Sequence, residues 1–232
     1  MRILLNLLVL LPFFISAQSL GDRVEAEYSI KEIGYDGKQS LVVGKVFFDG
    51  RNKTLTHTQS FPSENLFTFR DSTILLVSDD SVVMGSSSAL SIELSIYNLI
   101  LENRVSDLGL REKGFKLINV ENEGDKVVSQ WVYPGKVDFG TIMTIHKAGY
   151  LEGLVFYDQV GNALLKQYFK DYQKIGTVFF PSKIYESTFT PQGENRKITT
   201  HRNIKVNDYS DEDNFYSLFS NAYNRLIRST EN

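Results

Sequence analysis

Apolar and polar residues alternate along most of the chain after its first twenty residues. Val24, Ala26, Tyr28 and Ile30 are separated by polar neighbours, which is the period of two expected for a strand with one buried face. Similar apolar stretches occur at residues 40–48, 54–60, 65–69, 73–78, 126–133, 139–147, 150–157, 163–172, 175–180, 183–190 and 196–206. The turns between them are short and rich in Gly, Asp and Pro, so neighbouring strands should pair antiparallel. The pattern predicts a mainly β protein whose eleven or so strands must curl or close to hide their edges.

Two segments show the helical period instead. Residues 89–104 carry apolar side chains on nearly every side, so this helix should be buried or should cover an apolar surface. A second helix should begin at the acidic cap of residues 210–213, because apolar residues recur at helical spacing from Phe215 to Leu226. We expect that helix to dock one face on the sheet. No internal repeat or linker is present, which favours a single domain over residues 18–232.

The first seventeen residues have the pattern of a signal peptide. A positive start at Arg2 is followed by an apolar run over residues 3–15 and by the small residues Ser16 and Ala17. The run is short for a membrane span. The sequence therefore predicts a signal peptide, residues 1–17, cleaved after Ala17, and a mature chain in a bacterial periplasm. An uncleaved anchor is the alternative.

Composition and charge narrow the functional classes. The chain has 232 residues, of which 42% are apolar, and its 25 basic and 28 acidic residues give a net charge of −3. This balance argues against nucleic acid as a partner. The absence of cysteine excludes disulfides, thiol nucleophiles and thiolate metal sites.

No recognisable constellation of catalytic or metal-binding residues is present. His57, His146 and His201 fall on three different predicted strands, without a partner at metal-ligand spacing. Nucleophile-elbow and phosphate-loop motifs are missing. We therefore predict no catalytic residue, no metal and no cofactor, although a hydrolase whose site the sequence does not reveal stays open as an alternative.

Several predicted strands are apolar on both faces, notably at residues 41–43, 46–48, 74–77 and 178–180. A sheet with one solvated face would alternate strictly. Two helices are too few to cover so many strands, so part of this surface should enclose an apolar cavity. A packed core is the alternative for any one residue. The candidate cavity residues are Phe48, Phe69, Leu75, Trp131, Met143, Phe156 and Phe169.

Three short motifs are similar to those of the outer-membrane lipoprotein carrier family, the LolA-like proteins. They are the run at residues 44–57 with Pro62 and residues 67–77, the aromatic strand end at 131–134, and the Asp-x-x-Gly-Asn hairpin at 158–162. The resemblance covers roughly residues 24–207. It implies an unclosed antiparallel β-barrel of about eleven strands with covering helices, whose concave apolar face takes acyl chains.

The sequence also departs from that family. The first predicted strand begins without a preceding helix, and the C-terminal helix is an addition. The family's Arg-Pro turn has no match, so its arginine is not assigned to Arg51. The resemblance implies the fold more firmly than the shuttle role.

These observations lead to one functional expectation and one alternative. We expect a periplasmic, non-enzymatic protein that binds or carries a lipid or the acyl chains of a lipoprotein. Its partners would be that lipid or acylated lipoprotein and, transiently, a membrane or receptor, with the protein itself a monomer. The alternative is a non-catalytic structural or interaction protein of the cell envelope whose barrel is filled by side chains.

Overall fold

The structure is a computed structural model that describes residues 22–70, 73–78, 81–86, 95–135, 140–210, 220 and 224. The described elements are β1 (Arg23–Ile33), β2 (Gln39–Asp49), β3 (Thr54–Phe61), β4 (Asn65–Arg70), β5 (Thr73–Val77), β6 (Val82–Ser86), α2 (Ile96–Leu101), β7 (Lys116–Glu123), β8 (Lys126–Val132), β9 (Thr141–Lys147), β10 (Tyr150–Tyr157), β11 (Ala163–Ile175), β12 (Val178–Thr190) and β13 (Gly193–Val206).

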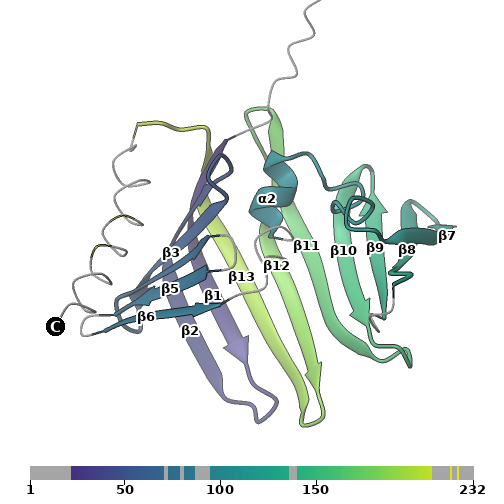
Figure 1. The fold of residues 1–232 in the computed structure, drawn as a ribbon, viewed down its shortest axis with the longest axis horizontal. Helices are drawn as coiled ribbons and strands as arrows, with labels where there is room; N and C mark the ends of the chain where they lie inside the picture. Colours follow the sequence, from purple (N-terminus) through teal and green to yellow (C-terminus); the bar gives the residue numbers. More distant parts are fainter. Residues whose placement is uncertain are drawn as a thin grey trace, which may run out of the picture.

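All thirteen described strands form one antiparallel sheet. Their order is β6-β5-β4-β3-β2-β1-β13-β12-β11-β10-β9-β8-β7, so the first and last strands pair at the centre and β6 and β7 lie at the edges. The sheet curves around α2 and does not close on itself (Figure 1). A mainly β, unclosed antiparallel fold is therefore confirmed.

The sheet has an inner face, against which α2 packs, and an outer face. On the inner face Val24 pairs with Phe48 and Ala26 pairs with Val46, and all four side chains are buried in the main core. Side chains of directly paired residues point to the same side of a sheet. The register therefore assigns every residue of a strand to one face or the other.

Helix α2 fills the upper part of the inner face. The Ser95 side chain caps it by accepting a hydrogen bond from the Asn98 backbone N–H. All six helical residues are buried, as expected for a segment that is apolar on nearly every side. The helix ends at Leu101, since Asn103 adopts a positive φ of 54°. The helix predicted over residues 89–104 therefore ends at Leu101 in the structure, and its residues 89–94 lie outside the described ranges.

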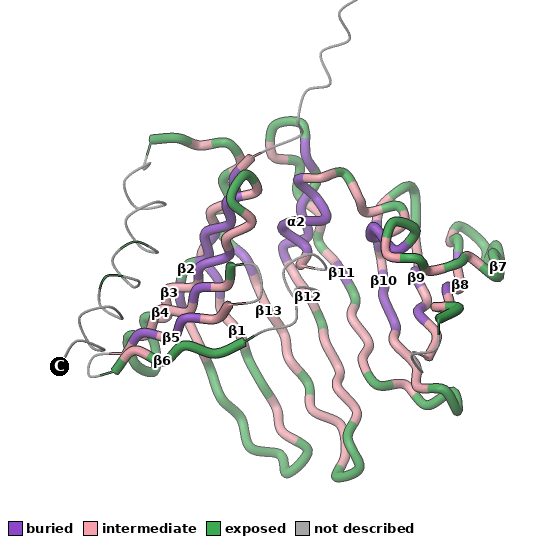
Figure 2. The backbone as a smooth tube through the Cα atoms, viewed as in Figure 1, coloured by how far each residue is buried: buried purple, intermediate pink, exposed green. Residues whose placement is uncertain are grey.

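The segment from residue 104 to residue 115 continues the cover over β7–β10. Leu108 and Leu110 are buried in the main core. The His146 imidazole Nε2 lies 2.7 Å from the Val105 carbonyl oxygen, which joins this segment to β9. Burial is concentrated around α2, whereas the lower ends of β1, β13, β12 and β11 are half-buried or exposed (Figure 2).

The strand count differs from the predicted eleven in two respects. β6 and β7 were not predicted: β6 has only three apolar residues, Val82, Val83 and Met84, and most residues of β7 are polar. The predicted strands at 175–180 and 183–190 instead form one strand, β12, which continues through Pro181. Its neighbour β11 adapts locally: Asp171 has a positive φ of 55°, and the Ser182 hydroxyl donates to the Asp171 carbonyl oxygen. The predicted C-terminal helix lies outside the described residues, apart from Ser220 and Asn224.

Candidate functional site

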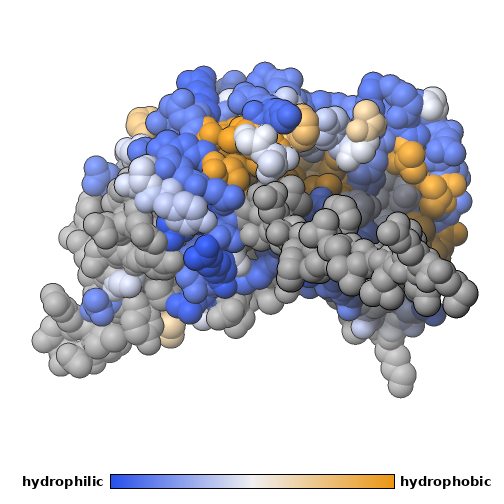
Figure 3. Space-filling view, turned by 90° about the horizontal axis from the view of Figure 1, so that it is seen from above, coloured by the Kyte–Doolittle hydropathy of each residue, from blue (hydrophilic) through white to orange (hydrophobic). Residues whose placement is uncertain are grey.

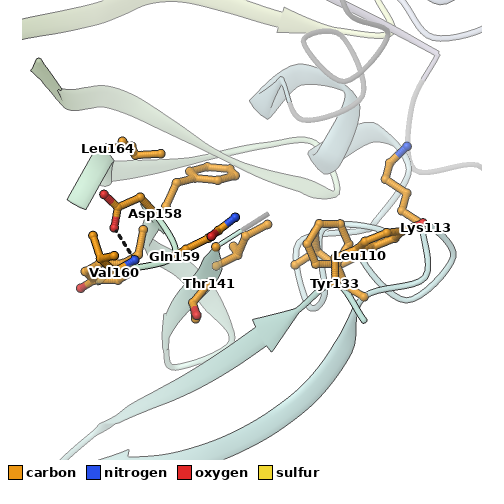
Figure 4. Close-up of a pocket in the computed structure, with 13 residues that line it drawn as sticks. Leu110, Lys113, Tyr133, Thr141, Asp158, Gln159, Val160 and Leu164 are labelled. Carbon is orange, nitrogen blue, oxygen red and sulfur yellow. Dashed lines mark hydrogen bonds between the residues drawn. The ribbon is translucent and has the colours of Figure 1, made fainter. Parts of the chain in front are cut away.

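An apolar cavity opens on the inner face beside the residue 104–115 segment. Its volume is about 820 Å³, within the ~300–1,000 Å³ typical of small-molecule sites. It is lined by Leu110, Lys113, Phe115, Tyr133, Gly140, Thr141, Ile142, Phe156, Tyr157, Asp158, Gln159, Val160 and Leu164. Leu110, Lys113 and Tyr133 stand on one side of it, and Asp158, Val160 and Leu164 stand on the other (Figure 4).

The sheet register positions the floor of this apolar cavity. Ile142 of β9 pairs with Trp131 of β8 and with Phe156 of β10, so the three side chains form a row on the inner face. Gly140, just before β9, allows the chain to pass close to the end of β10. A Cβ atom at that position would lie 1.9 Å from the Tyr157 carbonyl oxygen, so a side chain there would push the two walls apart.

Asp158, in the wall of the apolar cavity, and Trp131, in the adjoining core, already have polar partners. The Asp158 carboxylate accepts hydrogen bonds from the backbone N–H groups of Val160 and Asn162, at 3.0 and 2.7 Å. Hydrogen bonds from the Asn162 side chain and these N–H groups lower the Asp158 pKa. Asp158 is therefore a fixed carboxylate that shapes the β10–β11 hairpin. The Trp131 indole N–H donates to the Thr144 hydroxyl at 3.3 Å.

Above the apolar cavity, α2 closes the inner face with a buried aromatic cluster. Tyr97 packs against Phe48 and Phe180, with ring centroids 6.3 and 5.7 Å apart. Its hydroxyl lies 2.7 Å from His201 Nε2. Burial raises the Tyr97 pKa far above its usual value and lowers the His201 pKa to about 4, an effect that the Pro181 backbone carbonyl partly offsets. Tyr97 therefore keeps its proton and can donate it to a neutral His201.

The structure divides the seven candidate residues predicted from the sequence into three groups. Phe156 lines the apolar cavity. Phe48, Trp131 and Phe169 are buried in the main core on the inner face, and Phe69 packs against that core. None of these four lines the apolar cavity.

Leu75 and Met143 lie on the outer face, away from the other five. Leu75 pairs with Thr68, whereas the adjacent Ile74 pairs with the inner-face Phe69. Leu75 belongs to a small separate cluster with Val77, packed against Leu66 and Val82. Met143 pairs with Val155 and Gln130. It directly follows Ile142, whose side chain points to the inner face. A shift of one residue moves a side chain to the opposite face.

Four principal wall residues were not among the sequence candidates: Leu110, Phe115, Tyr133 and Ile142. Ile142 and Tyr133 lie within one or two residues of candidates that were chosen, and Tyr133 belongs to the strand-end motif at 131–134. Leu110 and Phe115 come from an irregular segment with no strand or helix period. Periodicity could not have identified those two.

The described residues also limit other kinds of site. They contain no group of three or more His, Asp or Glu side chains placed to hold a metal ion. In the same parts of the chain, no helix is both long enough and apolar enough to cross a membrane. Seen from above, apolar surface gathers at the middle of the molecule, bordered by hydrophilic surface, and again at the end where β7–β10 lie (Figure 3).

Comparison with known proteins identifies the fold. No model of a known protein family matches the sequence, and neither does any curated protein. Among solved structures, a LolA superfamily protein from Nitrosomonas europaea superposes with a TM-score of 0.58 at 14% identity, covering 83% of this chain and 90% of its own. A domain of a putative outer membrane lipoprotein-sorting protein from Vibrio parahaemolyticus superposes with a TM-score of 0.57 at 10% identity. This match covers 86% of this chain and 91% of that domain. The chain therefore has the LolA-like fold that its sequence motifs implied.

Proposed function

We propose that this protein is a periplasmic, non-catalytic carrier that shelters an acyl chain of a lipid or lipoprotein. The observation that carries the proposal is the apolar cavity of about 820 Å³ on the inner face of the sheet. The names of the structural neighbours, a LolA superfamily protein and a lipoprotein-sorting domain, support it. The pattern of residues 1–17 supports export, with the mature chain beginning at Gln18.

Binding would be driven by removing methylene groups from water. Each buried CH₂ contributes about 0.8 kcal/mol, which corresponds to roughly a fourfold change in affinity. The aromatic and aliphatic walls, including Phe115, Phe156 and Leu164, supply the apolar surface. Affinity for a series of saturated fatty acids should therefore rise by about fourfold for each added methylene until the apolar cavity is filled.

The experiment is displacement of an environment-sensitive fluorescent fatty acid from delipidated protein. Leu164→Trp places a larger ring at the wall of the apolar cavity and should weaken binding of a long-chain fatty acid at least tenfold. Leu164 is 47% exposed, so the larger ring can be accommodated without unfolding the protein. The matched control is Leu41→Trp, because Leu41 is also 47% exposed and does not line the apolar cavity.

Two results would contradict the proposal. One is a folded, lipid-free wild-type protein that does not bind the probe, which would favour the structural alternative with a filled barrel. The other is equal binding by the Leu164→Trp and Leu41→Trp variants, which would place the lipid elsewhere. Thermal unfolding of both variants shows whether the fold is retained.

A further inference from the structure

A second, polar cavity lies on the same face of the sheet as the apolar one. This polar trough has a volume of about 520 Å³ and is formed by the lower ends of β1, β2, β12 and β13. Its walls include Glu32, Ser40, Glu186, Thr188, Asn195 and Lys197. The proposed acyl-chain site does not use any of these residues.

The register shows that the polar trough and the apolar cavity are neighbours. Thr188, in the wall of the polar trough, pairs with Leu165 of β11, and Leu165 pairs with Phe156 in the wall of the apolar cavity. Paired residues lie on one face. Neighbouring strands are about 4.8 Å apart, so Thr188 and Phe156, two strands apart, are separated by about 10 Å. One extended molecule can therefore occupy both cavities.

A second row of paired residues shows the same change from charged to apolar. Glu32 pairs with Lys197, and Lys197 pairs with Glu186. Glu186 pairs with Gln167, and Gln167 pairs with the buried Leu154. Across the inner face the side chains thus change from ionic to amide to aliphatic within a few strands.

The polar trough contains charges of both signs, of which the Glu186–Lys197 pair is held by close contacts. Lys197 Nζ lies 2.5 Å from Glu186 Oε1, and the Gln167 side-chain amide donates to Glu186 Oε2 at 2.6 Å. The Glu186 side chain is only 16% exposed. On the β1 side, the Ser40 hydroxyl donates to the Glu32 carboxylate at 3.3 Å. Lys38 and Arg196 also line the polar trough. Its walls therefore present both cations and carboxylates, which complements a ligand that itself carries both charges.

We infer that the ligand is an amphiphile with a zwitterionic head group, such as a phosphoethanolamine lipid. Its head group lies in the polar trough and its acyl chain crosses β11 into the apolar cavity. This inference rests on the proposed acyl-chain site and adds the chemistry of the head group. The phosphate faces Lys197 and the ammonium faces Glu186 and Glu32. A free fatty acid has only a carboxylate and leaves those two acidic residues without a partner on the ligand.

The test compares two ligands with the same chain, palmitic acid and palmitoyl lysophosphatidylethanolamine, each below its micelle concentration. Both compete against the fluorescent fatty acid. The wild-type protein should bind the lysolipid about tenfold more tightly, the size expected for one added hydrogen bond to a charged group. Glu186→Gln should remove most of this preference while leaving palmitic acid binding within about twofold, because palmitic acid has no ammonium group. Lys197→Gln should weaken the binding of both ligands, since each presents an anionic group to Lys197.

Lys205→Gln is the matched control. Lys205 lies on the same strand, and its Nζ is 3.5 Å from Glu25, but it does not line the polar trough. This variant should keep the tenfold preference. Circular dichroism and melting temperature confirm that all three variants are folded.

The outcomes separate this inference from the function on which it rests. If palmitic acid binds but the wild-type protein shows no preference for the lysolipid, the head-group inference fails and the carrier function stands. Equal loss of the preference in Lys205→Gln and Glu186→Gln would also overturn the inference, as would a full tenfold preference in Glu186→Gln. If neither ligand displaces the probe, the carrier function fails together with it.

Discussion

The hydrogen bond between Tyr97 and His201 should contribute strongly to holding α2 on the sheet. Tyr97→Phe removes only the hydroxyl and retains the ring that packs against Phe48 and Phe180. His201 is 2% exposed, so water cannot easily replace the lost partner 2.7 Å from its Nε2. Leaving a buried polar atom without a hydrogen bond costs about 1–3 kcal/mol. We expect the free energy of unfolding to fall by that amount.

The assay is urea unfolding at pH 7.5, followed by the fluorescence of Trp131. This residue is the single tryptophan of the chain and is 2% exposed, so its emission should shift when the core opens. Tyr97→Ala should lower the free energy of unfolding more than Tyr97→Phe does, by about 3–5 kcal/mol, because it also removes the ring and leaves a cavity.

A double-mutant cycle tests whether the lost stability comes from leaving a buried polar atom without its partner. Replacing both partners, Tyr97→Phe with His201→Phe, leaves neither polar atom unpaired, so the double variant should lose less stability than the sum of the single variants. The reasoning is refuted if Tyr97→Phe changes the unfolding free energy by less than about 0.5 kcal/mol, the range of ordinary surface substitutions. Strict additivity of the two substitutions would refute it as well.

Two further predictions concern pH and export. Burial lowers the pKa of His57 and of His201 to about 4 from an ordinary value of 6.5, and the nearby His201 imidazole and Lys197 ammonium add to the effect at His57. The unfolded chain therefore binds more protons between those values, so stability should fall as pH decreases from about 6.5 to 4. For His201 the loss should reach about 3 kcal/mol, and urea titrations in which His201→Gln has the same pH slope as the wild type would contradict this. For export, the intact mass of protein from a periplasmic fraction should correspond to a chain beginning at Gln18, whereas protein that retains Met1 in the membrane fraction would show an uncleaved anchor.

The sequence predicted the sheet better than it predicted the site. Strict alternation in β1 correctly indicates one buried face, and Val24, Ala26 and Tyr28 are all buried. Where a strand is apolar on both faces, the sequence pattern does not show which side chains point to the inner face. Ile74 and Leu75 look equivalent in the sequence, yet only Ile74 is paired on the inner face.

The residues that line the two cavities depend on longer-range structure. Leu110 and Phe115 reach the apolar cavity from a segment without regular period, so their position depends on how the chain packs against β8–β11. Glu186 and Lys197 are on different strands, and only the pairing of β12 with β13 brings them together. Local pattern cannot predict such contacts, because they depend on register.

The pairing of β1 with β13 at the centre of the sheet has a consequence for the order of folding. Glu27 pairs with Arg202, and beyond this strand pair the Asn207 backbone N–H donates to the Arg23 carbonyl oxygen at 3.1 Å. When the chain emerges N-terminus first, β1 can pair with β2 early. The other edge of β1, which pairs with β13, stays unpaired until nearly all of the remaining strands have appeared. Contacts that join distant parts of a sequence form slowly, and open strand edges invite pairing with other chains. The middle of the finished sheet is therefore the last part to pair, and until then β1 presents an open edge to which another chain can pair.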